Sequence, residues 1–217
     1  MYGVIIVAGG AGKRMGIEMN KVLIEIHGKL LIDYVIERFE YDTGCEEIVL
    51  VVREDDLPLM IDKYSERVSK IVVGGDTRTE SVANGLKSIT SDYVLVHDGA
   101  RPYVNQSMLE RLKLALRDGD SVSLAVPVVE TVKRLNGEFF GDDVHREELV
   151  LMQTPQGFKT SILQEAYRKR EATAYTCDVT LVKCVLGISS TMVLGDRRNI
   201  KLTTLDDLAL LELILNV

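Results

Sequence analysis

The stretch Gly3-Val4-Ile5-Ile6-Val7-Ala8-Gly9-Gly10 decides the fold, because a continuous apolar run leads directly into a glycine-rich loop. Further runs rich in Val and Ile follow at 47–52, 70–73, 92–97 and 121–126. Amphipathic segments lie between them, and in 29–40 and 105–117 large apolar residues recur at helical spacing. Continuous apolar strands that alternate with such helices are typical of a parallel sheet covered on both faces. The sequence therefore predicts a three-layer α/β fold.

The alternation weakens after Pro127. Residues 128–148 are mostly polar and contain Asn136-Gly137, a pair that favours a tight hairpin turn. We expect this segment to be an extended arm that leaves the body and packs on a second subunit; the alternative is a solvated surface hairpin. Core patterns then resume with expected elements at 151–158, 161–170, 177–186, 191–194 and from 205 onward. We interpret 1–217 as a single domain with an arm at 128–148.

Charge and composition exclude several classes of protein. Lys and Arg number 26 against 33 Asp and Glu, a net charge of −7, which argues against general nucleic-acid binding. Small anionic substrates remain compatible, because a few cations in a cleft hold them. The three cysteines have no C-x-x-C spacing, which favours reduced thiols over a disulfide or zinc site. With no apolar run near about 18 residues and no signal peptide, we predict a cytoplasmic protein that does not bind membranes.

The glycine-rich loop continues as Ala11-Gly12-Lys13-Arg14-Met15. It is not a Walker A loop, because Arg14 stands where Ser or Thr is needed, and it lacks the third glycine of a dinucleotide fingerprint. Consecutive glycines still let backbone N–H groups approach an anion. Lys13 and Arg14 follow at once, and Lys21 comes shortly after. This combination suits a triphosphate; the alternative is a tight strand-to-helix turn with solvated cations.

Two other strands end in residues suited to a ligand. Asp98 follows the strand at 92–97, where open α/β sheets bind ligands, and its carboxylate suits Mg²⁺. Its neighbour His97 is expected to make structural hydrogen bonds. The strand at 70–73 runs into Gly74-Gly75-Asp76-Thr77-Arg78, ahead of a helix that contains Ser81. Gly75 and Asp76 could present backbone groups to a base edge, although the same stretch would also serve as an ordinary helix start.

A second group of polar and basic residues lies later in the chain. Thr131, Lys133 and Arg134 fall in the arm, Arg146 at its return, and Lys201 after the last expected strand. Each alone would be an ordinary solvated side chain. Together they form a second positive set, separate from the glycine loop. Two such sets predict two anionic substrates.

Six motifs, in order, connect the sequence to a known family. They are A-G-G-x-G-x-R-M from Ala8, G-G-x-x-R-x-x-S-V-x-x-G-L from Gly74, V-H-D-G-A-R-P from Val96, E-T-V-K from Glu130, R-x-x-L with Q-T-P-Q-x-F from Arg146, and N-I-K-L-T from Asn199. In this spacing the chain resembles the 2-C-methyl-D-erythritol 4-phosphate cytidylyltransferases of the non-mevalonate isoprenoid pathway. The first motif alone indicates only the wider nucleotidyltransferase superfamily. The second and third motifs together narrow the resemblance to cytidylyltransferases of this type.

The resemblance implies a Rossmann-like nucleotidyltransferase fold with a mostly parallel sheet, and a homodimer with an exchanged β-arm. It implies a transferase of isoprene biosynthesis that moves CMP from CTP to 2-C-methyl-D-erythritol 4-phosphate, with Mg²⁺ or another divalent cation, and releases pyrophosphate. The product is 4-diphosphocytidyl-2-C-methyl-D-erythritol. No general base is needed, because a phosphate monoester with a second pKa near 6 is mostly ionised at neutral pH.

The resemblance also assigns roles by matching motif positions. Arg14 and Lys21 would be catalytic and stabilise the transition state at the α-phosphate. The cytidine and its phosphates would be held by Ala8, Gly9, Gly10, Gly75, Asp76, Arg78 and Ser81. Asp98 would stand near the metal. The sugar phosphate would be positioned by Thr131, Arg146 and Lys201, the first two reaching across the dimer.

The sequence departs from the family pattern in two places. The usual Pro-Lys-Gln loop reads Asn20-Lys21-Val22, and Val150 replaces a frequent Trp. Two alternatives remain: a ribitol 5-phosphate cytidylyltransferase and a non-catalytic nucleotide-binding relative. The segments from Glu130 and Arg146 favour the erythritol enzyme over the first, and retention of both Arg14 and Lys21 opposes the second. A nicotinamide-dependent oxidoreductase fails the dinucleotide fingerprint.

Overall fold

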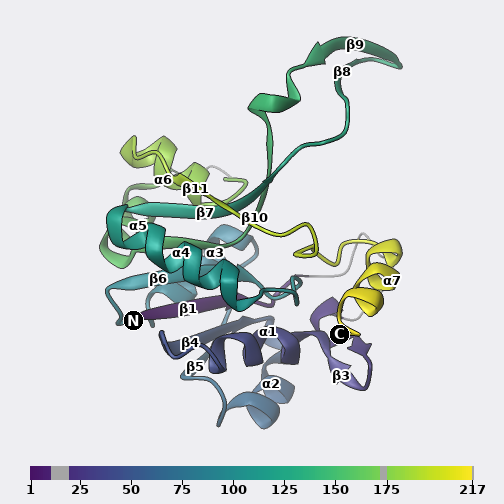
Figure 1. Ribbon diagram of the computed structural model, residues 1–217. Helices are drawn as coiled ribbons and strands as arrows, with labels where there is room; N and C mark the ends of the chain where they lie inside the picture. Colours follow the sequence, from purple (N-terminus) through teal and green to yellow (C-terminus); the bar gives the residue numbers. More distant parts are fainter. Residues whose placement is uncertain (11–19, 172–174, 217) are drawn as a thin grey trace.

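A mostly parallel sheet forms the centre of the protein, in a computed structural model that describes residues 1–10, 20–171 and 175–216 (Figure 1). Within these residues the main sheet has seven strands in the order β11-β7-β10-β6-β1-β4-β5. The strands are β1 (Tyr2–Val7), β4 (Cys45–Val52), β5 (Lys70–Val73), β6 (Tyr93–Asp98), β7 (Ser121–Pro127), β10 (Val150–Lys159) and β11 (Thr191–Leu194). Only β10, between β6 and β7, runs antiparallel to its neighbours in this described sheet.

Helices cover both faces of the sheet, which confirms the predicted three-layer α/β class (Figure 1). One face packs against α1 (Leu31–Glu40) and α4 (Gln106–Asp118). The other packs against α3 (Arg78–Leu86), α5 (Thr160–Lys169) and α6 (Asp178–Leu186). Alternate residues of a strand point to opposite faces, so β1 supplies buried side chains to both layers. This double burial is why its sequence is a continuous apolar run.

Several short elements were not expected from the sequence. The helix α2 (Leu57–Tyr64) contacts the edge strand β5, and a small hairpin pairs β2 (Glu25–Ile26) with β3 (Lys29–Leu30). The last helix, α7 (Leu205–Ile214), begins close to its predicted start and buries Leu211 in a separate small core beside β2 and α1. Across the described ranges, no helix is long and apolar enough to span a bilayer.

The strand order creates a topological switch point beside β1. From β1 the chain passes to β4 and β5 on one side, then returns to β6 on the other. Val7 is the register partner of Asp98, and the Gly99 N–H donates to the Val7 carbonyl at 2.9 Å. The glycine-rich loop after β1 and the acidic end of β6 therefore start side by side. Ligand crevices of open α/β sheets form at such a position.

Residues 128–148 form an arm that projects from the body (Figure 1). Within it, β8 (Val132–Asn136) pairs with β9 (Phe139–Val144) in a two-stranded sheet of its own. The tight turn lies one residue later than Asn136-Gly137, because Asn136 still pairs with Phe139 and the loop is Gly137-Glu138. Gly137 has φ +61°, a conformation that favours glycine. The arm is less polar than expected, since Leu135, Phe139 and Phe140 are 78%, 77% and 86% exposed.

Candidate active site

A buried carboxylate surrounded by three cations lies at the carboxyl end of β6. Asp98 accepts a hydrogen bond on Oδ1 from Nε of Arg78 at 3.1 Å, and on Oδ2 from Nζ of Lys201 at 2.6 Å. The Nε atom of Arg101 lies 4.0 Å from the same Oδ2. The three cations come from α3, from the segment after β11, and from the loop after β6. The sequence placed Lys201 in a separate positive set, whereas the structure joins it to Arg78 and Asp98.

Charge determines the ionisation state of this cluster. Burial acts to raise the pKa of Asp98, but Arg78, Lys201 and Arg101 outweigh it and hold that pKa well below its usual range. Burial acts to lower the pKa of Arg78, but Asp178 and Asp98 raise it well above its usual range. Nη2 of Arg78 and Nε of Arg101 are buried and have no hydrogen-bond partner in the described parts of the chain. The cluster is thus a fixed array of charges in which two N–H donors, from Arg78 and Arg101, are available to a ligand.

The segment that delivers Arg78 is an ordinary helix start, one of the two interpretations left open by the sequence. Thr77 is the N-cap of α3: its N–H donates to Oε2 of Glu80 at 2.9 Å, and the Glu80 N–H donates to Oγ1 of Thr77 at 3.1 Å. The hydroxyl of Ser81 accepts from the Gly75 N–H at 3.2 Å and donates to the Thr77 carbonyl at 2.9 Å. Asp76 is exposed. Ser81 therefore stabilises this turn, and the predicted contacts to a nucleotide stay predictions.

The start of the glycine-rich loop lies against Lys21, as expected. Ala8 is fully buried, Gly9 is half-buried and Gly10 is exposed. A Cβ atom added to Gly10 would lie 3.7 Å from Cε of Lys21, a side chain that is only 8% exposed. The Lys21 side chain therefore passes close to the backbone of Gly10 at the switch point. Arg14, the other predicted catalytic cation, lies outside the described residues.

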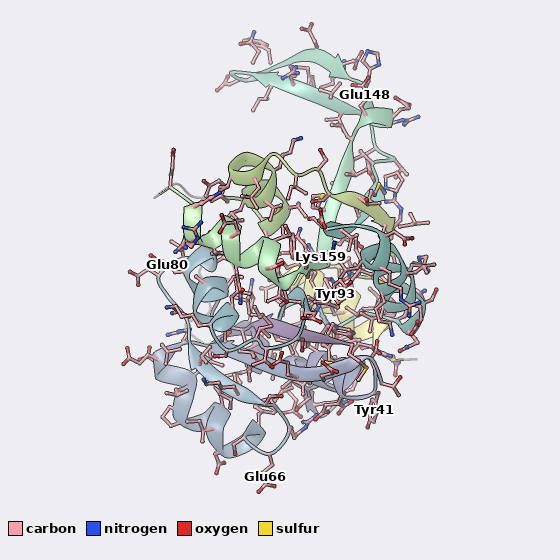
Figure 2. All side chains as sticks on the ribbon, turned by 90° about the vertical axis from the view of Figure 1, so that its left-hand side faces the viewer. Tyr41, Glu66, Glu80, Tyr93, Glu148 and Lys159 are labelled. Atoms are coloured by element: carbon pink, nitrogen blue, oxygen red, sulfur yellow. The ribbon has the colours of Figure 1, made fainter. Side chains whose placement is uncertain are left out.

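The predicted arm residues lie apart from this cluster within one chain. Thr131 is exposed, and Nη1 of Arg146 donates to the Val129 carbonyl at 2.8 Å, a contact within the base of the arm. Figure 2 shows Glu148, two residues from Arg146, on the arm and well away from the helices of the body. A single chain therefore does not bring Thr131 and Arg146 to Asp98.

Comparison with known proteins decides the family. The sequence matches the family model described as 2-C-methyl-D-erythritol 4-phosphate cytidylyltransferase over residues 2–217. The chain belongs to this family. A relative of that name from Halalkalibacterium halodurans is 39% identical over 221 residues, covering 99% of this chain and 96% of the relative. Another, from Clostridioides difficile, is 37% identical and covers 100% of this chain and 94% of the relative.

Solved structures agree with this assignment. The crystal structure of the 2-C-methyl-D-erythritol 4-phosphate cytidylyltransferase from Thermus thermophilus superposes with a TM-score of 0.84 at 29% identity, covering 99% of this chain and 98% of that one. The chain is therefore a nucleotidyltransferase of isoprenoid biosynthesis. It transfers CMP from CTP to 2-C-methyl-D-erythritol 4-phosphate and gives 4-diphosphocytidyl-2-C-methyl-D-erythritol. The family and activity that the motifs implied are confirmed.

In this cytidylyltransferase, Asn20 stands where the family pattern usually has proline, and its side chain makes three hydrogen bonds. Its Nδ2 donates to the Ala8 carbonyl and to Oδ2 of Asp56, both at 2.7 Å, and its Oδ1 accepts from the Val22 N–H at 3.3 Å. Asn20 is 1% exposed, so these bonds are shielded from water. Side-chain hydrogen bonds thus hold the backbone on either side of Lys21, where a proline ring would restrict it.

His97 makes the structural hydrogen bonds that were expected and connects them to Asp98. Its Nε2 donates to the Arg101 carbonyl at 3.0 Å, and its Nδ1 accepts from the Thr154 hydroxyl at 3.0 Å. The same hydroxyl accepts from the Asp98 N–H at 3.1 Å. Burial lowers the pKa of His97 to about 4, so the imidazole is neutral at pH 7 and the Thr154 hydroxyl is the donor to Nδ1. The network fixes the backbone of the acidic residue.

Other site-forming residues were missed because they were used only as family markers. Gln153 and Gln156 of β10 belong to Q-T-P-Q. Nε2 of Gln153 donates to the Asp196 carbonyl at 2.8 Å, and Oε1 of Gln156 accepts from the Asp178 N–H at 3.1 Å. The amide of Asn199 donates to the Thr154 carbonyl at 2.8 Å, which holds the segment just before Lys201. The motif therefore connects the end of β6, the start of α6 and the segment before Lys201. Two glutamines in an otherwise apolar strand were the sequence feature that could have indicated this role.

The buried histidine predicts how stability depends on pH. The pKa of His97 is about 4 in the folded protein against about 6.5 when unfolded. Its stabilising effect is complete above pH 6.5 and is lost as the pH falls toward 4. We expect the free energy of unfolding to fall by about 2 kcal/mol between pH 7 and pH 5 from this group.

Urea unfolding at several pH values measures this dependence. His97→Gln removes the titrating group and should flatten the curve between pH 5 and 7. His145→Gln, which replaces an exposed histidine, is the matched control and should keep the parent slope. An unchanged slope in His97→Gln would show that the imidazole does not enter the protein neutral.

Proposed function

We propose that cytidylyl transfer takes place at the switch point, between the glycine-rich loop after β1 and the cluster around Asp98. One observation carries this proposal: three cations from separate segments converge on one buried carboxylate, on the strand next to the one that leads to Gly10 and Lys21. Two anionic substrates repel each other, and a site that joins them must supply positive charge before they arrive. The cluster lies at the end of β6 and the loop begins at the end of the neighbouring strand β1, so both can act on one phosphate chain.

The proposed reaction is an in-line displacement at phosphorus. A phosphate oxygen of the sugar phosphate attacks the α-phosphorus of CTP and forms the new P–O bond. The bond from that phosphorus to the oxygen bridging to the β-phosphate breaks, and its electron pair leaves with pyrophosphate. The attacking dianion needs no proton removed, since its second pKa is near 6. The protein therefore contributes position and charge stabilisation.

The proposed roles follow the matched positions. Arg14 and Lys21 stabilise the charge that grows on the α-phosphate. Lys201 positions the sugar phosphate together with Thr131 and Arg146. The nucleotide is held by Ala8, Gly9, Gly10, Gly75, Asp76, Arg78 and Ser81. The buried position of Lys21 against the loop and the unpartnered N–H groups beside Asp98 support this assignment.

The proposal includes Mg²⁺ or another divalent cation near Asp98. Among the described residues there is no group of three His, Cys, Asp or Glu side chains suited to a metal. Asp98 alone fits a Mg²⁺ ion that is held mainly by phosphate oxygens, a usual arrangement for this ion. Its two oxygens each accept one hydrogen bond, at 3.1 Å and 2.6 Å, and retain lone pairs. When bound, the ion would neutralise charge on the triphosphate.

We also propose a homodimer in which each arm reaches the other subunit. The exposed side chains Leu135, Phe139 and Phe140 give the arm an apolar surface that a second copy can cover. Such an exchange would carry Thr131 and Arg146 to the partner's site. A cytoplasmic location is part of this proposal and is supported by the three free thiols.

Removing a catalytic cation should slow turnover strongly. For Arg14→Ala and Lys21→Ala we expect kcat to fall by about 10²–10³, as for the loss of one preorganised donor. Pyrophosphate release from CTP and Mg²⁺ with 2-C-methyl-D-erythritol 4-phosphate measures it. Lys87→Ala, at the far end of α3, is the control and should keep full activity. Near-parental turnover in either variant would refute the role of the replaced residue. With ribitol 5-phosphate in place of the erythritol substrate, none of the proteins should release pyrophosphate from CTP.

Loss of the arm guanidinium should weaken substrate binding instead. We expect Arg146→Ala to raise KM for the sugar phosphate about tenfold or more, with a small change in kcat, because a positioning cation acts on binding. The same assay at varied sugar phosphate gives both constants. Arg168→Ala, which removes an exposed arginine from α5, is the control. An unchanged KM would remove Arg146 from the substrate site.

The apolar arm predicts self-association. The double variant Phe139→Ser, Phe140→Ser should dissociate at concentrations where the parent sediments as a dimer, whereas Tyr41→Ser, on the body and 77% exposed, should not. Sedimentation velocity separates the two species. The exchange of arms between subunits has its own test. Lys21→Ala chains are mixed with Arg146→Ala chains, and activity is measured at a low concentration of the sugar phosphate. A mixed dimer with exchanged arms contains one intact site and regains activity, whereas arms that stay on their own subunit restore none.

A further inference from the structure

Asp178 is a buried acid that contacts Arg78 of the proposed site. It has not itself been assigned a role in binding substrate or metal. It is the first residue of α6 and is 1% exposed. Its Oδ2 accepts from Nη1 of Arg78 at 2.7 Å, and its Oδ1 accepts from the Tyr167 hydroxyl at 2.6 Å. Both carboxylate oxygens thus face donors inside the protein, which leaves Asp178 poorly placed to bind substrate itself.

The backbone beneath this carboxylate is also fixed. The N–H groups of Asp178 and Val179 both donate to Oε1 of Gln156, at 3.1 Å and 3.4 Å. Gln156 is 1% exposed and lies in β10, hydrogen-bonded between β6 and β7. The first turn of α6 is therefore capped by a side chain of the central sheet. Asp178 has little freedom to move when ligands bind.

The consequence falls on Arg78. Its guanidinium bridges two carboxylates, with Nε on Asp98 and Nη1 on Asp178. A guanidinium beside a single carboxylate tends to form two parallel hydrogen bonds to it. Here Asp98 receives only the Nε–H of Arg78, while Asp178 binds Nη1 on the opposite side of the guanidinium and holds the group in this position. Asp98 keeps acceptor capacity, and Nη2 of Arg78 stays buried without a hydrogen-bond partner in the described structure.

We propose that Asp178 is a positioning residue that divides the guanidinium of Arg78 between two acids and thereby keeps Asp98 and Nη2 of Arg78 available to the nucleotide and its metal. Tyr167 orients the carboxylate by its hydroxyl, and Gln156 fixes its backbone. This inference rests on the proposed roles of Arg78 and Asp98. It also explains a buried ion pair, which on its own is weak evidence of a stabilising contact.

A double-mutant cycle tests the inference through kcat/KM for CTP. Asp178→Asn keeps the shape of the side chain and removes its charge, and we expect a loss of about 10- to 100-fold, as when a supporting partner of a site ligand is removed. Because the residue acts through Arg78, the same change in the Arg78→Ala background should cost less than about twofold. Equal losses in both backgrounds, or none in the parent, would overturn the proposal.

Binding provides a readout separate from turnover. Calorimetric titration with CTP and Mg²⁺ should show a weaker Kd in Asp178→Asn and, by a smaller factor, in Tyr167→Phe. Tyr64→Phe is the matched control, since it also removes a buried tyrosine hydroxyl, in the core on the other face of the sheet, and should leave the Kd unchanged. An unchanged Kd in both site variants would also refute the role of Asp178. If Arg78→Ala alone changes neither Kd nor turnover, the assigned role of Arg78 fails instead.

Discussion

The attraction between one buried carboxylate and three cations is the interaction on which the site depends. Arginine and lysine side chains from α3, from the loop after β6 and from the segment after β11 repel one another, and Asp98 is what holds them close together. Its charge is secured because the cations outweigh the cost of burial. In the proposed mechanism, this positive charge is in place before either phosphate substrate binds, which is the condition for electrostatic catalysis without reorganisation.

The antiparallel strand β10 supplies much of the support for this cluster. Gln153, Thr154 and Gln156 hydrogen-bond to the segment before Lys201, to the end of β6 and to the start of α6. These contacts need polar side chains in a buried strand, and each polar group there must find a partner. The strand that breaks the parallel pattern therefore connects the elements that carry charge. A rigid sheet, rather than the loops alone, determines where the cations lie.

Local sequence patterns predict the parts of the fold that depend on the burial of one or both faces of an element. The strands, most helices and the arm lie close to their predicted ranges, because apolar periodicity reflects burial on one or both faces. The family was predicted from motifs and is confirmed. The exact turn in the arm and its exposed phenylalanines were missed, since hairpin register depends on pairing across the ladder. The helix α2 was missed because it is short.

By itself, the sequence determined the fold class, the order of elements and the candidates for charge stabilisation, because strand and helix periods and glycine-rich turns are local properties. Only the tertiary structure joined Lys201 to Asp98, 103 positions apart, and Asp178 to Arg78, 100 apart. Such pairs form because the folded sheet brings together helices and loops that are distant in sequence. Ion pairing depends on distance in space and on burial, and neither is encoded in spacing along the chain.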